Sequence, residues 1–181
     1  MNRTIITPAA LPSAALAELK QWLGITIPAD DAPLAALLRA ALEVCEAFTG
    51  AMPLVQGCEE VLRDTGCWQA LATRPVLEIT GVARIGLDGA RTALPGEGYA
   101  LELDDDGAGR LRVLAPGEGR VAVAFTAGLA AEWDALPEGL RHGIVRLAAH
   151  QHRERETSGA ASLPPASVAA LWRPWRRLRL S

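Results

Sequence analysis

The stretch that decides the fold runs Leu136-Pro-Glu-Gly-Leu-Arg-His-Gly-Ile-Val-Arg-Leu-Ala-Ala-His-Gln-His-Arg-Glu-Arg-Glu156. Pro137 suits the first turn of a helix, where its missing N–H leaves no hydrogen bond unmade. Leu140, Ile144 and Leu147 then recur at helical spacing and form one apolar stripe, with arginines and histidines on the other faces. The pattern predicts a helix over residues 136–156, against which the other helices pack.

Gly139 and Gly143 lie one helical turn apart in this stretch and give the helix a flat strip. Each glycine costs roughly 1 kcal/mol relative to alanine in a helix interior, so a compensating contact is needed. We therefore expect a neighbouring element to approach this strip closely.

Two amphipathic helices are predicted before the central one. The first begins with Ser13, a residue type that caps helices, and runs to about Leu23, where Gly24 ends it. The second follows Asp30-Asp31 and ends at Gly50. Its apolar stripe is the strongest periodic signal in the chain and consists of Leu34, Leu37, Leu38, Ala41, Leu42, Cys45 and Phe48.

Residues 57–128 change to short runs of period-2 character that are separated by turn residues, which is typical of antiparallel strands. Asp88-Gly89 suits a tight hairpin, and Asp104-Asp-Asp-Gly-Ala-Gly109 suits a longer one. The predicted strands are Glu59–Asp64, Cys67–Thr73, Val82–Leu87, Tyr99–Leu103, Leu111–Leu114 and Arg120–Thr126.

These elements predict an α+β fold: an α-helical bundle of about four helices, with an antiparallel β lobe inserted between the second and third helices. A short last helix is expected over Ala166–Trp172, after the flexible linker Thr157-Ser-Gly-Ala-Ala-Ser162. The expected organisation is 1–56 for the N-terminal helices, 57–130 for the β lobe, 131–172 for the C-terminal helices and 173–181 for a basic, Trp-containing tail.

Charge and cysteine content limit the class of protein. The 181 residues carry a formal net charge of −3, which argues against a general nucleic-acid-binding protein. Residues 173–181 hold four arginines and no acid, whereas the rest of the chain has 14 basic and 21 acidic residues. The three cysteines form no C-x-x-C pair, which disfavours a zinc site and fits a reducing compartment. Without a signal-peptide pattern or a long apolar run, we expect a protein made in the cytoplasm that does not enter a membrane.

No motif predicts catalysis, a cofactor or a metal centre. The histidines lack the H-E-x-x-H spacing of a zinc site, and we interpret them as surface or interfacial residues. They are His142, His150 and His152. Asp104, Asp105 and Asp106 lack the alternating spacing and the closing glutamate of a calcium loop, so an exposed hairpin tip is predicted there. Cys45 lies on an apolar stripe and is interpreted as a core residue rather than a reactive thiol.

The C-terminal tail is the strongest candidate for a binding site. Tryptophan and arginine, which dominate binding hot spots, alternate there with leucine. The residues concerned are Trp172, Arg173, Trp175, Arg176, Arg177, Leu178, Arg179 and Leu180. Two other interpretations stay open at this point: the tail folds back on its own domain, or its arginines bind nucleic acid through a weak, salt-sensitive interaction.

Several short segments follow one another in an order that matches a known family. They are Leu19-Lys-Gln-Trp-Leu23 followed by Asp30-Asp31, Ala47-Phe-Thr-Gly50, Gly98-Tyr99 and Gly109-Arg110 on either side of the acidic hairpin, Trp133-Asp-Ala-Leu-Pro137, Leu147-Ala-Ala-His150 and Arg153-Glu-Arg-Glu156. This order resembles the head–tail connector (adaptor, or head-completion) proteins of long-tailed bacteriophages and of phage-derived gene transfer agents. The resemblance covers about residues 16–172. One departure is His152, where such proteins often carry an aromatic residue.

The resemblance implies a non-enzymatic structural protein without a cofactor, which forms a ring of about a dozen copies below the portal protein of the filled capsid. Such a ring extends the DNA channel, lets DNA pass without sequence-specific binding, and supports a tail-side stopper or the next neck protein. Tail residues 172–180 would bind the portal, and Asp104–Asp106 would lie at the rim or lumen of the channel. The protein would be made in the bacterial cytoplasm and would end in the neck of the virion or gene transfer agent particle.

Two alternatives come from other classes of protein. The first is a small regulatory or nucleic-acid-binding domain that uses the Arg-rich tail, and salt-dependent binding to duplex DNA would favour it. The second is an enzyme of an unrecognised family, which turnover of a substrate would favour.

Overall fold

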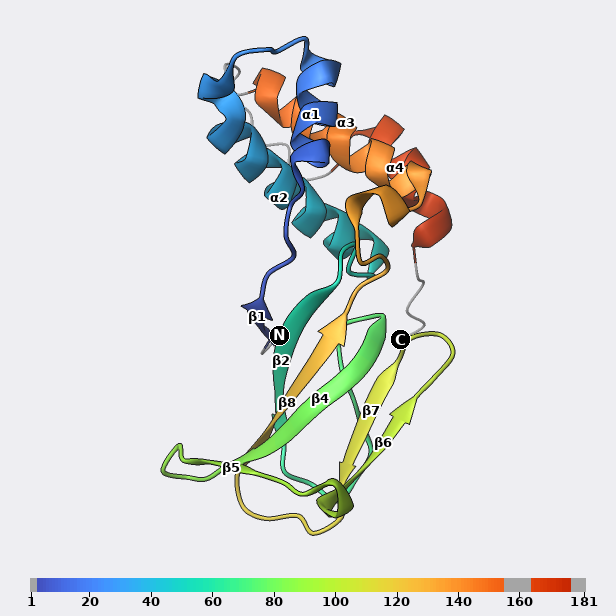
Figure 1. The fold of residues 1–181 in the computed structure, drawn as a ribbon. Coiled ribbons are helices and arrows are strands. Elements are labelled where there is room, and N and C mark those ends of the chain that lie inside the picture. Colours follow the sequence, from blue (N-terminus) through green and yellow to red (C-terminus); the bar gives the residue numbers. More distant parts are fainter. Residues whose placement is uncertain (1–2, 155–163, 177–181) are drawn as a thin grey trace. The chain divides into compact units, whose positions relative to one another are not determined.

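The computed structural model describes residues 3–154 and 164–176 and divides into two compact units. One unit, here the β unit, combines residues 1–9 with 55–128 and holds the strands. The other, the helical unit, combines residues 10–54 with 129–181 and holds the α-helices (Figure 1). The predicted α+β class, with the β lobe between the second and third helices, is confirmed.

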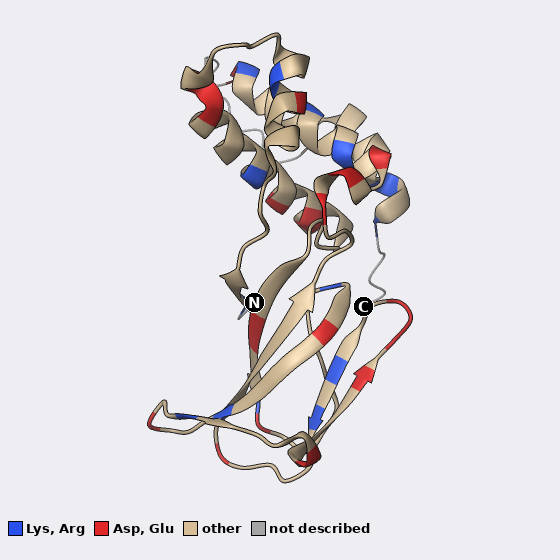
Figure 2. Ribbon diagram, viewed as in Figure 1, with Lys and Arg blue, Asp and Glu red and all other residues tan. Residues whose placement is uncertain are grey.

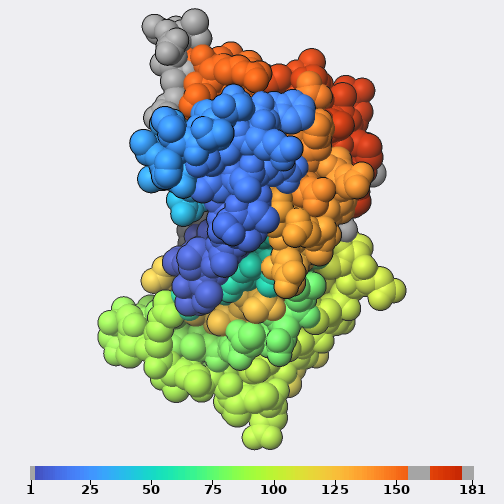
Figure 3. Space-filling view, turned by 45° about the horizontal axis from the view of Figure 1, so that its top comes forward, coloured from blue at the N-terminus to red at the C-terminus, as the bar shows by residue number. Residues whose placement is uncertain are grey.

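In the described residues the helical unit contains four α-helices. Their bounds are α1 Ser13–Leu23, α2 Asp31–Thr49, α3 Glu138–Glu154 and α4 Ala166–Trp172, and 3-10 turns cover Pro28–Asp30, Trp133–Ala135 and Arg173–Trp175. As predicted, the other helices pack on α3, which contacts α1, α2 and α4. In the space-filling view the orange residues of α3 lie beside both the blue residues of α1 and the red residues of α4 (Figure 3).

Glycines end the first two helices, as predicted. Gly24 and Gly50 follow α1 and α2 with φ values of 71° and 75°, a left-handed conformation that a Cβ disfavours. The predicted capping role of Ser13 is wrong, because Pro12 is the N-cap and Ser13 is already helical, with no side-chain capping bond. The extended backbone of Pro12 (φ −71°, ψ 155°) leads into the helix, whose first residue is Ser13.

Helix α4 packs against the glycine strip of α3. A Cβ at Gly143 would lie only 2.8 Å from Cε2 of Trp172, so no other residue fits without a shift. At Gly139 a Cβ would lie 3.5 Å from the backbone oxygen of Leu171. The predicted close approach is confirmed, and the buried Leu140 on α3 belongs to the same core.

The β unit contains two antiparallel sheets, with strand orders β1-β2-β8-β4-β5 and β3-β7-β6. The strand bounds are β1 Arg3–Thr7, β2 Gln56–Arg63, β3 Gln69–Ala70, β4 Val76–Ile85, β5 Arg91–Ala93, β6 Tyr99–Leu103, β7 Gly109–Val113 and β8 Arg120–Ala127. Buried side chains from both sheets form the core of this unit, with Val123 and Phe125 from β8 and Leu111 and Val113 from β7.

The structure differs most from the predicted strand pattern at four places. Strand β3 covers only Gln69–Ala70 of the predicted Cys67–Thr73. Strand β1 pairs with β2, so residues 3–7 belong to the β unit and not to the N-terminal helices. Strand β5 is a short edge strand of three exposed residues. It was not predicted because its sequence lacks the alternation of apolar and polar residues that marks a strand. Strand β4 begins at Val76 rather than Val82, because two register shifts break its period-2 pattern.

Glu60 is a buried carboxylate that ties β2 to the segment between β3 and β4. It is 5% exposed and accepts hydrogen bonds from Thr73 Oγ1 at 2.6 Å, Thr73 N at 2.8 Å and Ala72 N at 2.8 Å. The substitution Glu60→Ala leaves these donors without their acceptor, so we expect it to lower the free energy of unfolding by about 2–3 kcal/mol in urea titrations. The matched control is Glu59→Ala, which removes the bidentate pair with the exposed Arg91 and should lower the free energy of unfolding much less, because solvent screens that pair. Equal losses in the two variants would contradict this role of Glu60.

The three cysteines differ in accessibility, which predicts selective labelling. Cys45 and Cys58 are buried, whereas Cys67 is exposed, and burial raises the pKa of the Cys45 thiol to about 12. Because the thiolate is the reactive form, an alkylating reagent at about pH 8 should label Cys67 alone in the native protein, as measured by mass spectrometry. Native labelling of Cys45 would contradict this.

The raised pKa of Cys45 also predicts a pH dependence of stability. The unfolded thiol ionises near its ordinary pKa of 9.0, whereas the folded thiol stays protonated up to about pH 12. The free energy of unfolding should therefore fall as the pH rises above about 9.

Candidate functional site

The C-terminal segment contains one buried and one exposed tryptophan. Trp172, the last residue of α4, is 0% exposed, and its Nε1 donates a hydrogen bond to the Leu140 carbonyl oxygen at 3.3 Å. Its ring lies 5.9 Å from the Phe48 ring between centroids. This corrects the expectation that Trp172 is part of an accessible tail, because its indole completes the helical core and cannot also be offered to a partner.

The accessible part of the segment begins one residue later. Arg173–Trp175 forms a 3-10 turn, in which Trp175 is 39% exposed. The guanidinium carbon of Arg176 lies 5.5 Å from the centroid of the Phe48 ring, a cation–π contact that holds the residue after this turn against α2. Arg173, Trp175 and Arg176 are therefore at the surface, as predicted.

The remaining predicted members of this site lie outside the described residues. They are Arg177, Leu178, Arg179 and Leu180. Their predicted role in binding a portal stays a prediction.

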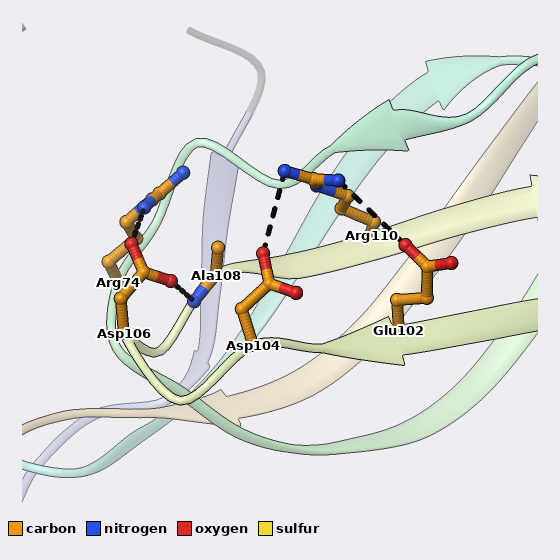
Figure 4. Close-up of polar contacts among 6 residues, drawn as sticks. All are labelled: Arg74, Glu102, Asp104, Asp106, Ala108 and Arg110. Carbon is orange, nitrogen blue, oxygen red and sulfur yellow. Dashed lines mark hydrogen bonds and ion pairs between the residues drawn. The ribbon is translucent and has the colours of Figure 1, made fainter.

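The acidic hairpin is exposed as predicted, but neighbouring arginines balance part of its charge. Figure 4 shows the turn between β6 and β7, where Asp106 accepts a hydrogen bond from Arg74 Nη1 at 2.9 Å and another from Ala108 N at 3.0 Å. Arg110 on β7 reaches Asp104 at 3.5 Å and Glu102 at 3.8 Å. Ion pairs within the hairpin, together with the one to Arg74, thus hold its conformation.

The charge left on this hairpin is smaller than the sequence indicates. The residues Glu102, Asp104, Asp105 and Asp106 carry four negative charges, and Arg74 and Arg110 offset two of them. Asp105 has no ion-pair partner among the described residues. Figure 2 shows the same arrangement, with a red turn beside the blue segments of β7.

The histidines occupy separate places on α3. His142 makes an edge-to-face contact with Trp22 of α1, with ring centroids 5.2 Å apart, and His150 Nε2 lies 3.0 Å from Glu154 Oε1. A surface pocket of about 510 Å³ lies near this contact and is lined by Glu18, Gln21, Trp22 and Arg153. The sequence does not indicate this pocket, because its lining comes from two helices that lie more than a hundred residues apart in the chain.

Among residues 3–154 and 164–176, no three His, Cys, Asp or Glu side chains are grouped so that they could hold a metal ion. Within the same residues, no helix is long and apolar enough to cross a membrane. The described surface carries two groups of side chains suited to binding another protein. One is the exposed Trp175 with the neighbouring arginines, and the other is the acidic hairpin, which ion pairs hold in place.

Comparisons with known proteins identify the kind of assembly. No protein-family model and no curated protein matches the chain. A chain in the solved neck of an empty gene transfer agent (GTA) particle, computed with C6 symmetry, is 32% identical, with a TM-score of 0.77, and the match covers 100% of this chain and 98% of that one. A chain of the virion of a native GTA particle is also 32% identical, with a TM-score of 0.76 and the same coverage. A chain in the neck of a native GTA particle, computed with C12 symmetry, is 31% identical, with a TM-score of 0.72 and coverages of 98% and 97%.

These matches run over the full length of both chains, so they include the helical unit, the β unit and the C-terminal segment together. At this identity and coverage the likeness reaches beyond the fold to the family. The chain belongs to the family of neck proteins of gene transfer agent particles, and is a phage-like structural component of the neck.

Proposed function

We propose that this protein is the head–tail adaptor of such a particle: a ring that sits below the portal protein, extends the DNA channel and links the capsid to the tail. The observation that carries the proposal is the end-to-end match to chains in GTA necks, including one computed with C12 symmetry. A neck computed with that symmetry supports a ring of about a dozen copies, and the order of sequence segments supports the adaptor among the neck proteins. The role is structural and requires no catalysis.

The C-terminal segment is the proposed portal-binding element. Its surface side chains Arg173, Trp175 and Arg176 lie next to residues 177–180, which add two arginines and two leucines. Arginine binds carboxylates in a planar, bidentate geometry that lysine does not provide. A dozen such segments on one ring bind by avidity, so each single contact can be weak.

The acidic hairpin is proposed to lie at the rim or lumen of the channel. Negative charge on a channel wall repels the DNA phosphates, so DNA slides past without binding. The hairpin retains a net charge of about −2 after the pairing of its acids with Arg74 and Arg110. Twelve copies of this charge would still surround the passing DNA.

The test is reconstitution with the portal protein. Purified chain is mixed with assembled portal rings, and the complex is weighed by native mass spectrometry. The proposal predicts about a dozen copies of this chain on each portal ring. Absence of any complex with portal rings, together with binding to isolated tails, would contradict it.

A further inference from the structure

Three arginines stand in one row across the five-stranded sheet of the β unit. Arg63 of β2 lies directly opposite Arg120 of β8. Ile85 of β4 lies opposite Arg120 on the other side, and Arg91 of β5 lies opposite Ile85. Residues that pair across an antiparallel sheet lie on the same face, so the three arginines share one face. All three are exposed, and we call Arg63, Arg91 and Arg120 the arginine row.

Two members of the row have no counter-charge of their own. Arg91 is held by Glu59 of β2, with hydrogen bonds of 2.7 and 2.9 Å. Arg63 and Arg120 form no ion pair with any residue that the structure describes. Like charges directly opposite each other destabilise a sheet, so this pair carries a cost in the free chain. An anionic partner would offset that cost.

The acidic hairpin is a surface of opposite charge on the same unit. It retains a net charge of about −2 after pairing with Arg74 and Arg110, and Asp105 has no ion-pair partner in the described part of the chain. Arg63 and Arg120 together supply two positive charges. The two surfaces therefore match in sign and in amount of charge.

The hairpin and the arginine row lie at opposite ends of β4. The amide of Val76, the first residue of β4, donates a hydrogen bond of 2.9 Å to the Gly107 oxygen in the hairpin. The row crosses β4 at its last residue, Ile85. At about 3.3 Å per residue, the ends of this ten-residue strand lie about 30 Å apart (Figure 1). The hairpin therefore cannot reach the row of its own chain.

A second copy of this chain supplies the fitting partner. A ring of identical subunits is built from head-to-tail contacts, in which one surface of each copy meets a different surface of the next. Two oppositely charged surfaces at opposite ends of one unit meet that requirement. Duplex DNA fits less well, because its binding strengthens with the number of phosphates neutralised, and the row has only two unpaired arginines on a chain of net charge −3.

We propose that the arginine row of one copy binds the acidic hairpin of the next copy in the ring. Arg63 and Arg120 contact carboxylates of residues 104–106, and arginine makes such contacts in bidentate fashion. The hairpin then lies at the boundary between two subunits, at the rim of the ring rather than in its lumen. The inference rests on the proposed ring, although not on the position of that ring below a portal.

The first experiment tests the contact on the free full-length chain. Single cysteines are placed beside each surface without removing a charge: Leu87→Cys in the turn after β4 and Leu103→Cys on β6, at leucines that are 83% and 49% exposed. Cys67→Ser removes the exposed native thiol. The two variants are mixed at high concentration and low salt and treated with a short bis-maleimide. We expect several-fold more cross-linked dimer in the mixture than with either variant alone. Equal yields would overturn the proposal.

The matched charge reversals are Arg120→Glu in the row and Arg39→Glu on α2, both at exposed arginines. In the copy with the cysteine beside the row, Arg120→Glu should lower the yield of cross-linked dimer roughly tenfold, and Arg39→Glu should leave it unchanged. Asp105→Arg in the other copy should restore part of the yield lost in Arg120→Glu. Equal losses in the two reversals would show that only net charge acts, and would overturn the assignment of the row.

Two other partners are separated by the same cross-link. A short DNA duplex added in equimolar amount should leave the yield unchanged, and loss of the cross-link would instead assign the row to nucleic acid. Removal of residues 177–181, which include two arginines, should also leave the yield unchanged. Loss of the cross-link in that truncated chain would assign the partner of the hairpin to the C-terminal segment. Either loss would overturn the proposal.

The second experiment places the contact in assembled particles. The chain that carries both Leu87→Cys and Leu103→Cys is cross-linked in particles and separated on a denaturing gel. Because a short cross-linker cannot join the two ends of one β unit, we expect a ladder of multimers up to about a dozen copies. Monomer alone, with the chain present in the neck, would overturn the contact and leave the adaptor function standing. Cross-linking in solution by a chain that is absent from the neck would contradict the adaptor function and leave the contact standing.

Discussion

Replacing Trp172 by alanine is expected to lower the free energy of unfolding by about 3–5 kcal/mol, as found when fully buried tryptophans are truncated in other proteins. The indole fills the space above Gly143 on α3 and lies against Phe48 on α2. Its loss leaves a cavity between three helices and removes the hydrogen bond to the Leu140 carbonyl oxygen. Urea unfolding followed by helical circular dichroism measures the loss.

The matched control is Trp175→Ala, three residues further along the chain. Because Trp175 is on the surface, this variant should cost less than about 1 kcal/mol. A stable Trp172→Ala protein that only fails to bind the portal would contradict the core role of Trp172. A large loss of stability in Trp175→Ala would show that the turn at Arg173–Trp175 also belongs to the core.

Removing residues 177–181 is expected to give a folded protein that no longer joins heads to tails. The cut leaves Arg176 on the Phe48 ring, so the helical core keeps all of its described contacts. Because a ring binds its portal through many copies at once, loss of the segment should reduce tailed particles by roughly 100-fold or more. Electron microscopy should show DNA-filled heads without tails.

A variant in which glycine and serine replace residues 177–181 at unchanged length controls for the length of the chain, and it should behave like the truncation. Charge reversal of Arg176 and Arg177 should weaken docking in part. Unfolding of the truncated chain would show that the segment is part of the protein's own core. Normal numbers of tailed particles would contradict the portal-binding role.

The local elements could be read from the sequence because their signals are local. Helices α1 and α4 occupy the predicted residues, since apolar spacing, prolines and glycines set their ends without help from the rest of the chain. Strand β6 also matches its prediction. The glycine strip of α3 was readable because an unfavourable residue in a helix implies a contact that offsets it.

Features that depend on long-range pairing could not be read in this way. Strand β1 pairs with β2, whose partner residues lie 50 to 57 positions further along the chain, and β1 has too few residues for its pattern to reveal the partner. The burial of Trp172 depends on its packing against Gly143 of α3 and Phe48 of α2, which no spacing in the tail can show. The same holds for Arg74, which approaches Asp106 only because the hairpin folds back to it.

The exposure of the tail residues was therefore predicted less well than the fold. Both tryptophans were expected to be accessible, but Trp172 is buried and only Trp175 lies at the surface, because composition cannot separate a core side chain from a surface one at a helix end. The role of Trp175 in binding stays a prediction. The half-exposed leucines of β6 show the same limit, because they look like core residues in the sequence. The sheet order shows that β6 has no neighbouring strand on one side in the described part of the chain.

The most direct test of the adaptor function is a cryo-electron microscopy reconstruction of DNA-filled particles that contain this chain. We expect a ring of about a dozen copies between portal and tail, with the segment after Trp172 in contact with the portal. A neck in which this chain contacts only tail proteins, or a particle that lacks the chain, would contradict it.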